Sequence, residues 1–204
     1  MKVNTNSWNK FRYTLYTPIY DLMVCYFKQS RKNSIDALNV KTSDKLLIIG
    51  AGTGLDLEFL PNETEIIATD ITPSMILCIK ARNKLLNKNM QAIVMDGQSL
   101  SFDDNSFDIV VLHLILAVIP DPNLCIKEAE RVLKPGGQIA VLDKFVPKNR
   151  QVSTLRKVIN LFSNLFFTDI TRNFESIVKN TKLTVITDKD AGFNGNFRII
   201  RLKK

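Results

Sequence analysis

The sequence predicts an α/β fold: a doubly wound, mostly parallel sheet with helices on both faces and an antiparallel last strand. From Lys45 onward, short aliphatic runs without polar alternation take turns with stretches of helical spacing, as expected for parallel strands buried on both faces. Near the end, two further strand-like runs are joined by a short loop with glycine, which is typical of a hairpin. The 204 residues suit one domain with its own core, so we expect a single domain, 1–204.

The N-terminal residues 1–40 are predicted to form helical pieces interrupted at Pro18. They contain all the tyrosines and the only tryptophan of the chain, namely Trp8, Tyr13, Tyr16, Tyr20 and Tyr26. A buried tyrosine needs a partner for its hydroxyl, so the cluster suggests a segment laid over a polar pocket. The alternative is a helix that packs on the side of the domain.

Five aliphatic runs are predicted to form the parallel strands: 46–49, 66–69, 92–95, 109–112 and 139–142. Two helices between them, 72–88 and 121–133, each begin with an N-cap residue followed by a first-turn proline. The KPGG segment at 134–137 ends the second helix. This order, with right-handed crossovers, gives a Rossmann-like sheet whose ligand lies at the carboxyl ends of the strands.

The last third of the chain departs from simple alternation. Apolar residues recur at helical spacing over 155–166, with Arg156, Lys157, Asn160 and Asn164 on the other face. A short helix over 173–179 follows, and strands over 183–187 and 197–202 flank the loop DAGFNGN. We expect the last strand to enter the sheet antiparallel to its neighbours.

The net charge of +8 is concentrated in this last third. Residues 144–204 hold 13 Lys and Arg against 4 Asp and Glu, whereas residues 1–143 hold 15 against 16. A basic region attracts anionic partners such as a lipid surface or an acidic substrate. A solvated face that aids solubility is the alternative.

The sequence argues against a zinc site and a membrane span. Its cysteines, Cys25, Cys78 and Cys125, stand far apart, and the only histidine is His113, so no zinc ligand set is expected. No stretch resembles a signal peptide, and the longest apolar run, 109–119, contains His113 and is too short to cross a bilayer. We expect a soluble, cytoplasmic protein without a bound metal.

The stretch LLIIGAGTGLDLEFL, residues 46–60, places three glycines after the first strand. Glycines there tighten the turn and let a ligand touch the main chain, while the next helix offers free N–H groups. In the dinucleotide spacing GxGxxG the helix receives a pyrophosphate, but here the third glycine comes one residue early. Asp56 and Glu58 in the predicted helix suit a cofactor with a positive charge better than a pyrophosphate.

Carboxylates follow the next two predicted strands. Asp70 comes twenty residues after Gly50, where a carboxylate can accept both hydroxyls of a ribose. Asp96, with Gly97 and Gln98 after it, can accept from the exocyclic amine of adenine. Together the three strand ends describe a pocket for adenosine without a phosphate clamp. Each aspartate alone has a simpler explanation as a cap or turn residue.

Four motifs in this order resemble the class I S-adenosylmethionine-dependent methyltransferases: LLIIGAGTGLDLEFLP, ATDITPSMI, VMDGQSLSFDDNSFDIV and RVLKPGGQIAVLDKF. The resemblance covers Lys45 to Phe145 and is nearest to the subgroup of ubiquinone/menaquinone C-methyltransferases and bacterial phospholipid N-methyltransferases. It implies S-adenosyl-L-methionine as cofactor and S-adenosyl-L-homocysteine as product, with a lid over 1–40, a cofactor-binding core over 41–145, and helices and a closing hairpin over 146–204.

The resemblance also implies roles for individual residues. The three glycines run beside the methionine part, and Asp70 binds the ribose. Asp96, together with Gly97 and Gln98, binds adenine. The candidate cofactor-binding residues are Gly50, Ala51, Gly52, Gly54, Asp70, Ile71, Met75, Asp96, Gly97, Gln98 and His113. Where the family often has an acidic residue before the first glycine, this chain has Ile49, so the partner of the methionine amino group is not identified.

The candidate catalytic residues are Tyr16, Tyr20 and His113. The sulfonium methyl is already activated, so the enzyme mainly aligns the reactants, which can lower the barrier by roughly 7–11 kcal/mol. We expect Tyr16 and Tyr20 to close over the methyl group and His113 to face the acceptor. A histidine that is hydrogen-bonded at the sheet edge is the alternative for His113.

The acceptor is either a lipid head group or a small soluble amine, thiol or phenol. Residues 151–204 combine an apolar helical stripe with basic residues, which suits peripheral contact with an anionic membrane; a stripe that covers the sheet is the alternative. Three other functions compete: a non-catalytic binder or regulator, an NAD enzyme, and a nucleic-acid methyltransferase. HLILAV stands where base-modifying enzymes carry an Asn/Asp-Pro-Pro-aromatic motif, so nucleic acid is disfavoured.

Overall fold

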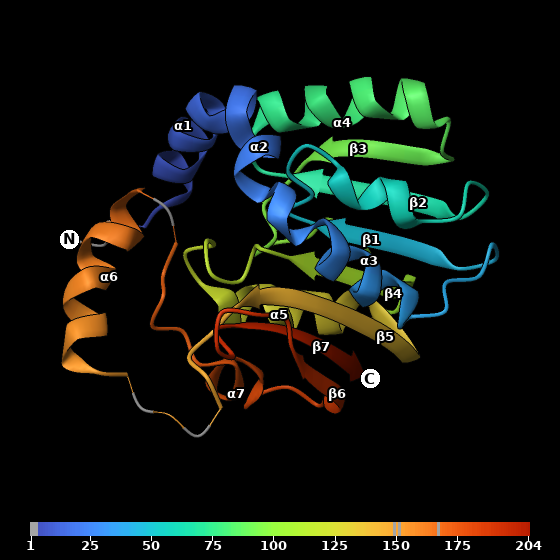
Figure 1. Ribbon diagram of the computed structural model, residues 1–204. Helices are drawn as coiled ribbons and strands as arrows, with labels where there is room; N and C mark the ends of the chain where they lie inside the picture. Colours follow the sequence, from blue (N-terminus) through green and yellow to red (C-terminus); the bar gives the residue numbers. More distant parts are fainter. Residues whose placement is uncertain (1–3, 149, 151, 167) are drawn as a thin grey trace.

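A computed structural model describes residues 4–148, 150, 152–166 and 168–204. Over these residues, one seven-stranded sheet has the order β3-β2-β1-β4-β5-β7-β6. The first five strands pair in parallel, and β7 pairs antiparallel with both β5 and β6. The predicted mostly parallel sheet with an antiparallel last strand is therefore confirmed (Figure 1).

The strands lie close to their predicted positions, with one large difference. Their bounds are β1 Lys45–Ile49, β2 Glu65–Asp70, β3 Met90–Val94, β4 Phe107–His113, β5 Leu133–Lys144, β6 Thr184–Asp190 and β7 Phe197–Lys203. The KPGG segment was expected to end the helix before it, and that helix does end at Val132, but the segment itself belongs to β5. Leu133 already pairs with Phe107 of β4, and Lys134 Nζ lies 2.8 Å from an Asp108 carboxylate oxygen, so pairing with β4 outweighs the local turn signal.

The helices include α4 and α5 at the predicted places. Their bounds are α1 Asn6–Tyr16, α2 Tyr20–Val24, α3 Lys28–Asp36, α4 Pro73–Leu86, α5 Pro122–Val132, α6 Thr154–Phe166 and α7 Phe174–Val178. The helix expected after the glycine turn is only a short 3₁₀ segment, η3, Leu55–Phe59. Two more 3₁₀ segments, Thr17–Ile19 and Cys25–Phe27, link the N-terminal helices.

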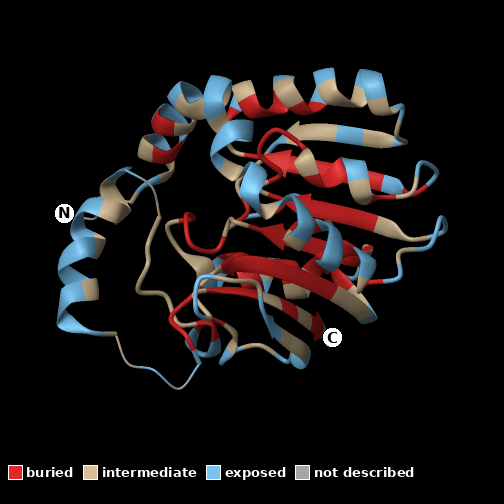
Figure 2. Cartoon of the chain, in the orientation of Figure 1, coloured by how far each residue is buried: buried red, intermediate tan, exposed pale blue. Residues whose placement is uncertain are grey.

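The core lies on both faces of the central strands (Figure 2). Alternate residues of β1 point to opposite faces: Leu47 packs with the side of the sheet covered by α5 and α7, and Leu46 with the side covered by α3 and α4. Both side chains are fully buried. Burial on two faces explains why these strands read as unbroken aliphatic runs.

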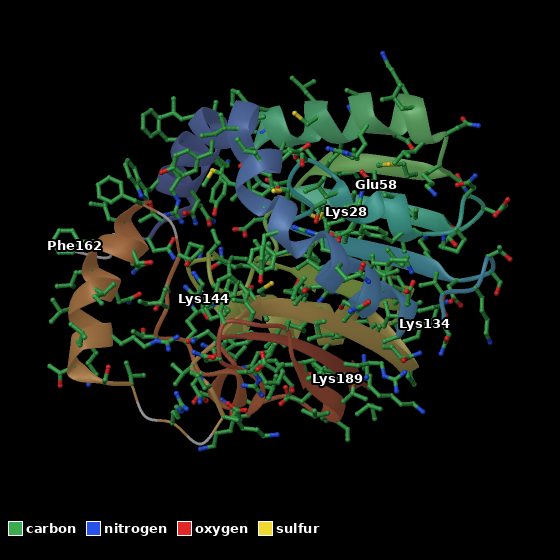
Figure 3. All side chains as sticks on the ribbon, viewed as in Figure 1. Lys28, Glu58, Lys134, Lys144, Phe162 and Lys189 are labelled. Carbon is green, nitrogen blue, oxygen red and sulfur yellow. The ribbon has the colours of Figure 1, made fainter. Side chains whose placement is uncertain are left out.

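Helix α6 presents its apolar stripe outward. Its large apolar side chains are between 47% and 72% exposed: Leu155, Val158, Ile159, Leu161, Phe162 and Phe166. Figure 3 shows Phe162 pointing away from the sheet. Its polar residues make the contacts with the protein, since Asn160 accepts from the Ile170 N–H and Ser163 donates to the Thr168 carbonyl. The stripe therefore does not cover the sheet. None of the described helices is both long and apolar enough to cross a membrane.

Candidate functional site

The first pocket lies where the carboxyl ends of β1 and β2 meet the N-terminal helices, and we call it the glycine-loop pocket. Its walls include Asn6, Asn9, Tyr13, Tyr20, Ile49, Gly50, Gly52, Asp70, Ile71, Thr72, Met75, Met95, Asp96, Gly97, Leu114, Ile115, Val118, Ile119 and Pro120. The pocket therefore sits at the sheet edge that the sequence predicted.

Two glycines of the turn leave room for side chains from other segments. Gly50 and Gly52 have φ values of 68° and 58°, a left-handed conformation that favours glycine. A Cβ at Gly50 would lie 2.6 Å from the Ile115 side chain, and one at Gly52 would lie 3.1 Å from the Tyr20 ring. The turn is thus covered by an apolar residue and by a tyrosine of the N-terminal segment.

Asp70 is held in place by main-chain donors. One of its carboxylate oxygens accepts the Gly52 N–H at 2.9 Å, and the other accepts the Thr72 N–H at 2.8 Å. The Thr72 side chain also hydrogen-bonds this carboxylate, so one of the four lone-pair sites of its two oxygens remains for a ligand hydroxyl. Burial raises the pKa of Asp70 to about 6, although these two N–H donors oppose the shift. A hydroxyl of a ribose fits this arrangement.

Asp96 lies at the other end of the pocket. Its carboxylate accepts from the Gln98 main-chain N–H at 3.0 Å and from the Asn6 side-chain amide at 2.6 Å. Asn6 belongs to α1, so the N-terminal helix reaches the position where adenine was expected. The pocket thus holds the main chain of the glycine turn, then Asp70, and then Asp96. This order fits the methionine, ribose and adenine parts of S-adenosylmethionine.

The structure brings most of the sequence-predicted cofactor residues together. Seven of them line the pocket: Gly50, Gly52, Asp70, Ile71, Met75, Asp96 and Gly97. Four lie outside this lining: Ala51, Gly54, Gln98 and His113. The Gln98 side chain donates a hydrogen bond to the Asp96 carboxylate. Gly54 packs close to Leu57 and Ile79.

His113 lines neither the glycine-loop pocket nor the second pocket that lies beside it. Its side chain is fully buried; Nδ1 lies 2.8 Å from an Asp56 oxygen and Nε2 lies 2.9 Å from Ser34 Oγ. We expected His113 to face the acceptor; its burial and its two hydrogen-bond partners instead favour the alternative of a hydrogen-bonded histidine at the sheet edge.

Asp56 and Glu58 do not face the ligand either, contrary to the charge argument made from the sequence. Arg31 Nη1 lies 2.9 Å from each Asp56 oxygen, and Glu58 pairs with Lys28 at 3.0 Å. Burial would raise the pKa of Asp56, but Arg31 and His113 hold it well below its usual range. These acids bind α3 to the glycine turn.

A second pocket, the tyrosine pocket, lies beside the first. Its walls are Tyr13, Tyr16, Tyr20, Met23, Val24, Phe27, Leu114, Val118, Asp143, Lys144, Thr168 and Phe197. Four of these residues also line the glycine-loop pocket: Tyr13, Tyr20, Leu114 and Val118. The two pockets therefore adjoin at these four residues, as an enzyme that transfers a group directly between two ligands needs.

Asp143 supplies a carboxylate to the tyrosine pocket, and sequence reasoning missed it. Its oxygens accept from the Ala117 N–H at 3.0 Å and from the Lys144 N–H at 2.7 Å. Burial raises the pKa of Asp143 to about 6. The rule that identified Asp70 and Asp96, an acid at the end of a buried strand, would also have found it after 139–142.

The two candidate tyrosines have different places. Tyr20 lines both pockets, and Tyr16 lines only the tyrosine pocket. The Tyr16 hydroxyl donates to the Phe166 carbonyl at 2.8 Å, which ties α1 to α6. Burial raises the pKa of Tyr20 to about 12, with the Arg31 charge opposing the shift. Tyr13, not among the candidates, also lines both pockets.

Comparisons with known proteins agree with this geometry. The sequence profile of the methyltransferase domain matches residues 47–141. A phosphatidylethanolamine N-methyltransferase of Cereibacter sphaeroides is 23% identical over 91% of this chain and 93% of its own length. A ubiquinone/menaquinone biosynthesis C-methyltransferase of Teredinibacter turnerae is 34% identical over 65% of this chain and 55% of its own length. The chain thus spans only about half of the quinone-modifying relative.

The fold also recurs in solved structures. Geranyl diphosphate C-methyltransferase from Streptomyces coelicolor A3(2), in complex with geranyl diphosphate and S-adenosyl-L-homocysteine, superposes with a TM-score of 0.71. The two sequences are 15% identical, and the match covers 86% of this chain and 79% of the other.

Proposed function

We propose that this chain, which matches the methyltransferase domain over residues 47–141, is a class I S-adenosylmethionine-dependent methyltransferase and that it methylates an acceptor held in the tyrosine pocket. The observation that carries the proposal is that the two pockets adjoin, since they share Tyr13, Tyr20, Leu114 and Val118. A methyl donor in the glycine-loop pocket and an acceptor in the tyrosine pocket come next to each other at these residues.

The residues of the glycine-loop pocket bind and orient the donor. Asp70 accepts a ribose hydroxyl, Asp96 accepts from adenine, and Tyr20 covers the turn at Gly52. Bound S-adenosylmethionine supplies an activated methyl group on a positively charged sulfur. The acceptor atom forms its bond to carbon as the carbon–sulfur bond breaks, and alignment of the three atoms is the main contribution of the protein.

Asp143 takes the proton that the acceptor atom loses. It is buried beside the tyrosine pocket, and its pKa of about 6 keeps it ionised at neutral pH yet basic enough to bind a proton. Phenol rings and Phe197 surround the remaining space, and Lys144 adds a positive charge. Such a pocket suits an apolar acceptor with one ionisable nucleophile.

We further propose that the acceptor is a lipid head group and that residues 151–204 touch an anionic membrane. The exposed apolar side chains of α6 support this, because Leu161 and Phe162 are 72% and 68% exposed, and Lys157 lies on the same helix. An exposed apolar face beside basic residues is the pattern of interfacial helices. A cytoplasmic location with peripheral membrane contact belongs to the same proposal. We also propose that the domain is divided into a lid over 1–40, a core over 41–145 and a closing region over 146–204.

Calorimetry with S-adenosyl-L-homocysteine and with NADH tests the donor site. We expect heat of binding with the first ligand and none with the second. A chain that binds NADH and not S-adenosyl-L-homocysteine would contradict the proposed function.

Sedimentation with lipid vesicles tests the membrane contact. We expect the protein to pellet with phosphatidylglycerol vesicles and less with phosphatidylcholine vesicles, and Leu161→Glu to reduce pelleting. Leu85→Glu is the matched control, because Leu85 is 86% exposed on α4, outside both pockets. If Leu85→Glu and Leu161→Glu reduce pelleting equally, α6 is not the docking face.

A further inference from the structure

A third hollow runs along the inner side of α6, and we call it the α6 groove. Leu155, Arg156 and Ile159 line it from the helix, and Phe27, Phe193 and Phe197 line it from the body of the protein, together with Lys144, Ser153, Ile170 and Asn196. The ring centroids of Phe27 and Phe197 are 4.5 Å apart, and those of Phe193 and Phe197 are 5.3 Å apart. The groove is therefore floored by aromatic rings.

The groove adjoins the tyrosine pocket. Phe27, Lys144 and Phe197 line both hollows, just as Tyr13 and Tyr20 line both the tyrosine pocket and the glycine-loop pocket. The three hollows follow one another from the cofactor site to the surface at α6. A molecule with its reactive end at the tyrosines has room to extend past Lys144 into the groove.

Two positive charges stand where the tyrosine pocket meets the groove. Figure 3 shows Lys144 at the end of the sheet that faces α6. Lys144 Nζ lies 5.3 Å from the Phe197 ring centroid and 3.3 Å from Thr168 Oγ1. The Arg156 guanidinium donates to the Asn196 side chain at 2.7 Å and to the Ile170 and Phe145 carbonyls.

Neither charge makes a direct ion pair among the residues that the structure describes. Burial lowers the pKa of Lys144 and of Arg156, while the nearby Asp143 opposes the shift for Lys144 and the nearby Asp169 opposes it for Arg156. Two partly buried cations between aromatic walls, neither in contact with a carboxylate, suit an anionic group carried on an apolar chain.

We infer that the α6 groove binds the apolar chain of the acceptor, with a phosphate between Lys144 and Arg156 and the nucleophile in the tyrosine pocket. The inference rests on the proposed function, because it places the acceptor relative to the donor. It narrows the acceptor class to phosphate-bearing amphiphiles. It also gives α6 two faces with different functions: the inner face binds the apolar chain of the acceptor, and the outer face contacts the bilayer.

Calorimetry on the full chain, saturated with S-adenosyl-L-homocysteine, tests the inference. The probes are alkylphosphoethanolamines with chains from butyl to decyl, kept below their critical micelle concentrations, and phosphoethanolamine without a chain. We expect affinity to rise about fourfold for each methylene that enters the groove. An affinity that does not depend on chain length would overturn the inference, whereas absence of S-adenosyl-L-homocysteine binding would overturn the proposed function itself.

Three variants locate the binding site. Ile159→Glu should abolish the chain-length dependence, because Ile159 lines the groove. Lys144→Gln should weaken binding of every phosphate-bearing probe about tenfold or more. Leu161→Glu, on the same helix but outside the groove lining and 72% exposed, should leave binding of monomeric probes unchanged.

The variants also separate a lipid site from a protein interface. If Leu161→Glu and Ile159→Glu weaken binding of the monomeric lipid probes equally, the apolar chain of the acceptor does not bind in the α6 groove. The assignment also fails if the wild-type chain elutes as a dimer that both substitutions dissociate, because α6 is then covered by a second copy. Thermal melting of each variant shows that it is folded before binding is compared.

Discussion

Asp143 is the residue on which the proposed chemistry depends most. It is 1% exposed and its two oxygens accept main-chain N–H groups, so its position is fixed while burial keeps its pKa near 6. A fixed carboxylate at the end of a buried strand is well placed to accept a proton from a neutral nucleophile.

Replacement of Asp143 by Asn should lower kcat by roughly 10²–10⁴-fold, the usual contribution of a positioned base. In the wild-type enzyme, kcat should fall as the pH drops through about 6, because the carboxylate becomes protonated. The Asn variant should lose this dependence. S-adenosyl-L-homocysteine affinity is the control for structure, and an unchanged kcat with unchanged affinity would remove Asp143 from the chemistry.

His113 should matter for stability and not for turnover. It joins Asp56 of η3 to Ser34 of α3 in a buried network. His113→Asn should lower the free energy of unfolding by about 1–3 kcal/mol, because buried polar partners lose their hydrogen bonds. Denaturant unfolding and kcat measured on the same preparation check this. A large loss of kcat at unchanged stability would restore a chemical role.

At the scale of elements, the N-terminal segment is tied to the site at several points. Asn6 contacts Asp96 at one end, and Thr17 Oγ1 lies 2.8 Å from Ser74 Oγ of α4. Asp21 pairs with Arg82, also on α4. The segment therefore covers the glycine-loop pocket, which supports the proposed lid.

Tyr20→Phe should weaken binding of S-adenosyl-L-homocysteine by about three- to tenfold, the size of one ordinary hydrogen bond. The ring stays over Gly52, but the hydroxyl that lies near it is lost. Tyr26→Phe is the matched control, because Tyr26 is 68% exposed and lines neither pocket. Equal effects of the two substitutions on affinity would show that Tyr20 has no special part in the lid.

The orientation of α6 could not be read from its sequence. The spacing of 155–166 predicted an amphipathic helix, and the structure has one. Which face turns inward depends on polar contacts with residues far along the chain, such as Trp8 Nε1 donating to the Leu165 carbonyl at 2.8 Å. Periodicity defines two faces of a helix but does not identify what lies opposite each face.

At the scale of the whole molecule, the donor site is built from elements that are far apart in the sequence. Its site takes walls from α1, the glycine turn and the ends of β2 and β3, so bound S-adenosyl-L-homocysteine should stabilise the entire fold. At a hundred times its Kd it should add about 2.7 kcal/mol, which corresponds to a rise in Tm of roughly 5–10 °C for a chain of this size. Differential scanning calorimetry measures this rise, and NADH should give none.

The rise in Tm should be smaller at pH 5 than at pH 7.5. Asp70, with a pKa of about 6, is protonated at the lower pH and accepts a ribose hydroxyl less well. Asp70→Asn should give a small rise that does not change with pH. A wild-type rise that is the same at both pH values would show that the Asp70 charge does not contribute to binding.

Without ligand, the two buried carboxyl groups should make the fold less stable as the pH rises. Between their ordinary value of 3.8 and about 6, Asp70 and Asp143 hold protons in the folded chain that they release on unfolding. The contribution of these two groups to the free energy of unfolding therefore falls as the pH rises through this range. Urea unfolding across the range checks the sign, and Asp143→Asn should reduce the slope.

The sequence by itself determined the sheet, the glycine turn and two of the three carboxylates at the strand ends. These features are local: aliphatic runs, caps and turn residues act within a few positions, and a parallel sheet brings its carboxyl ends to one edge. Only the tertiary structure decided that His113 and Asp56 are buried away from the pockets, that Tyr13 and Asp143 line them, and that α6 turns its apolar stripe outward. Each of these depends on contacts between residues far apart in the chain, and the free energy of such contacts does not appear in any local pattern.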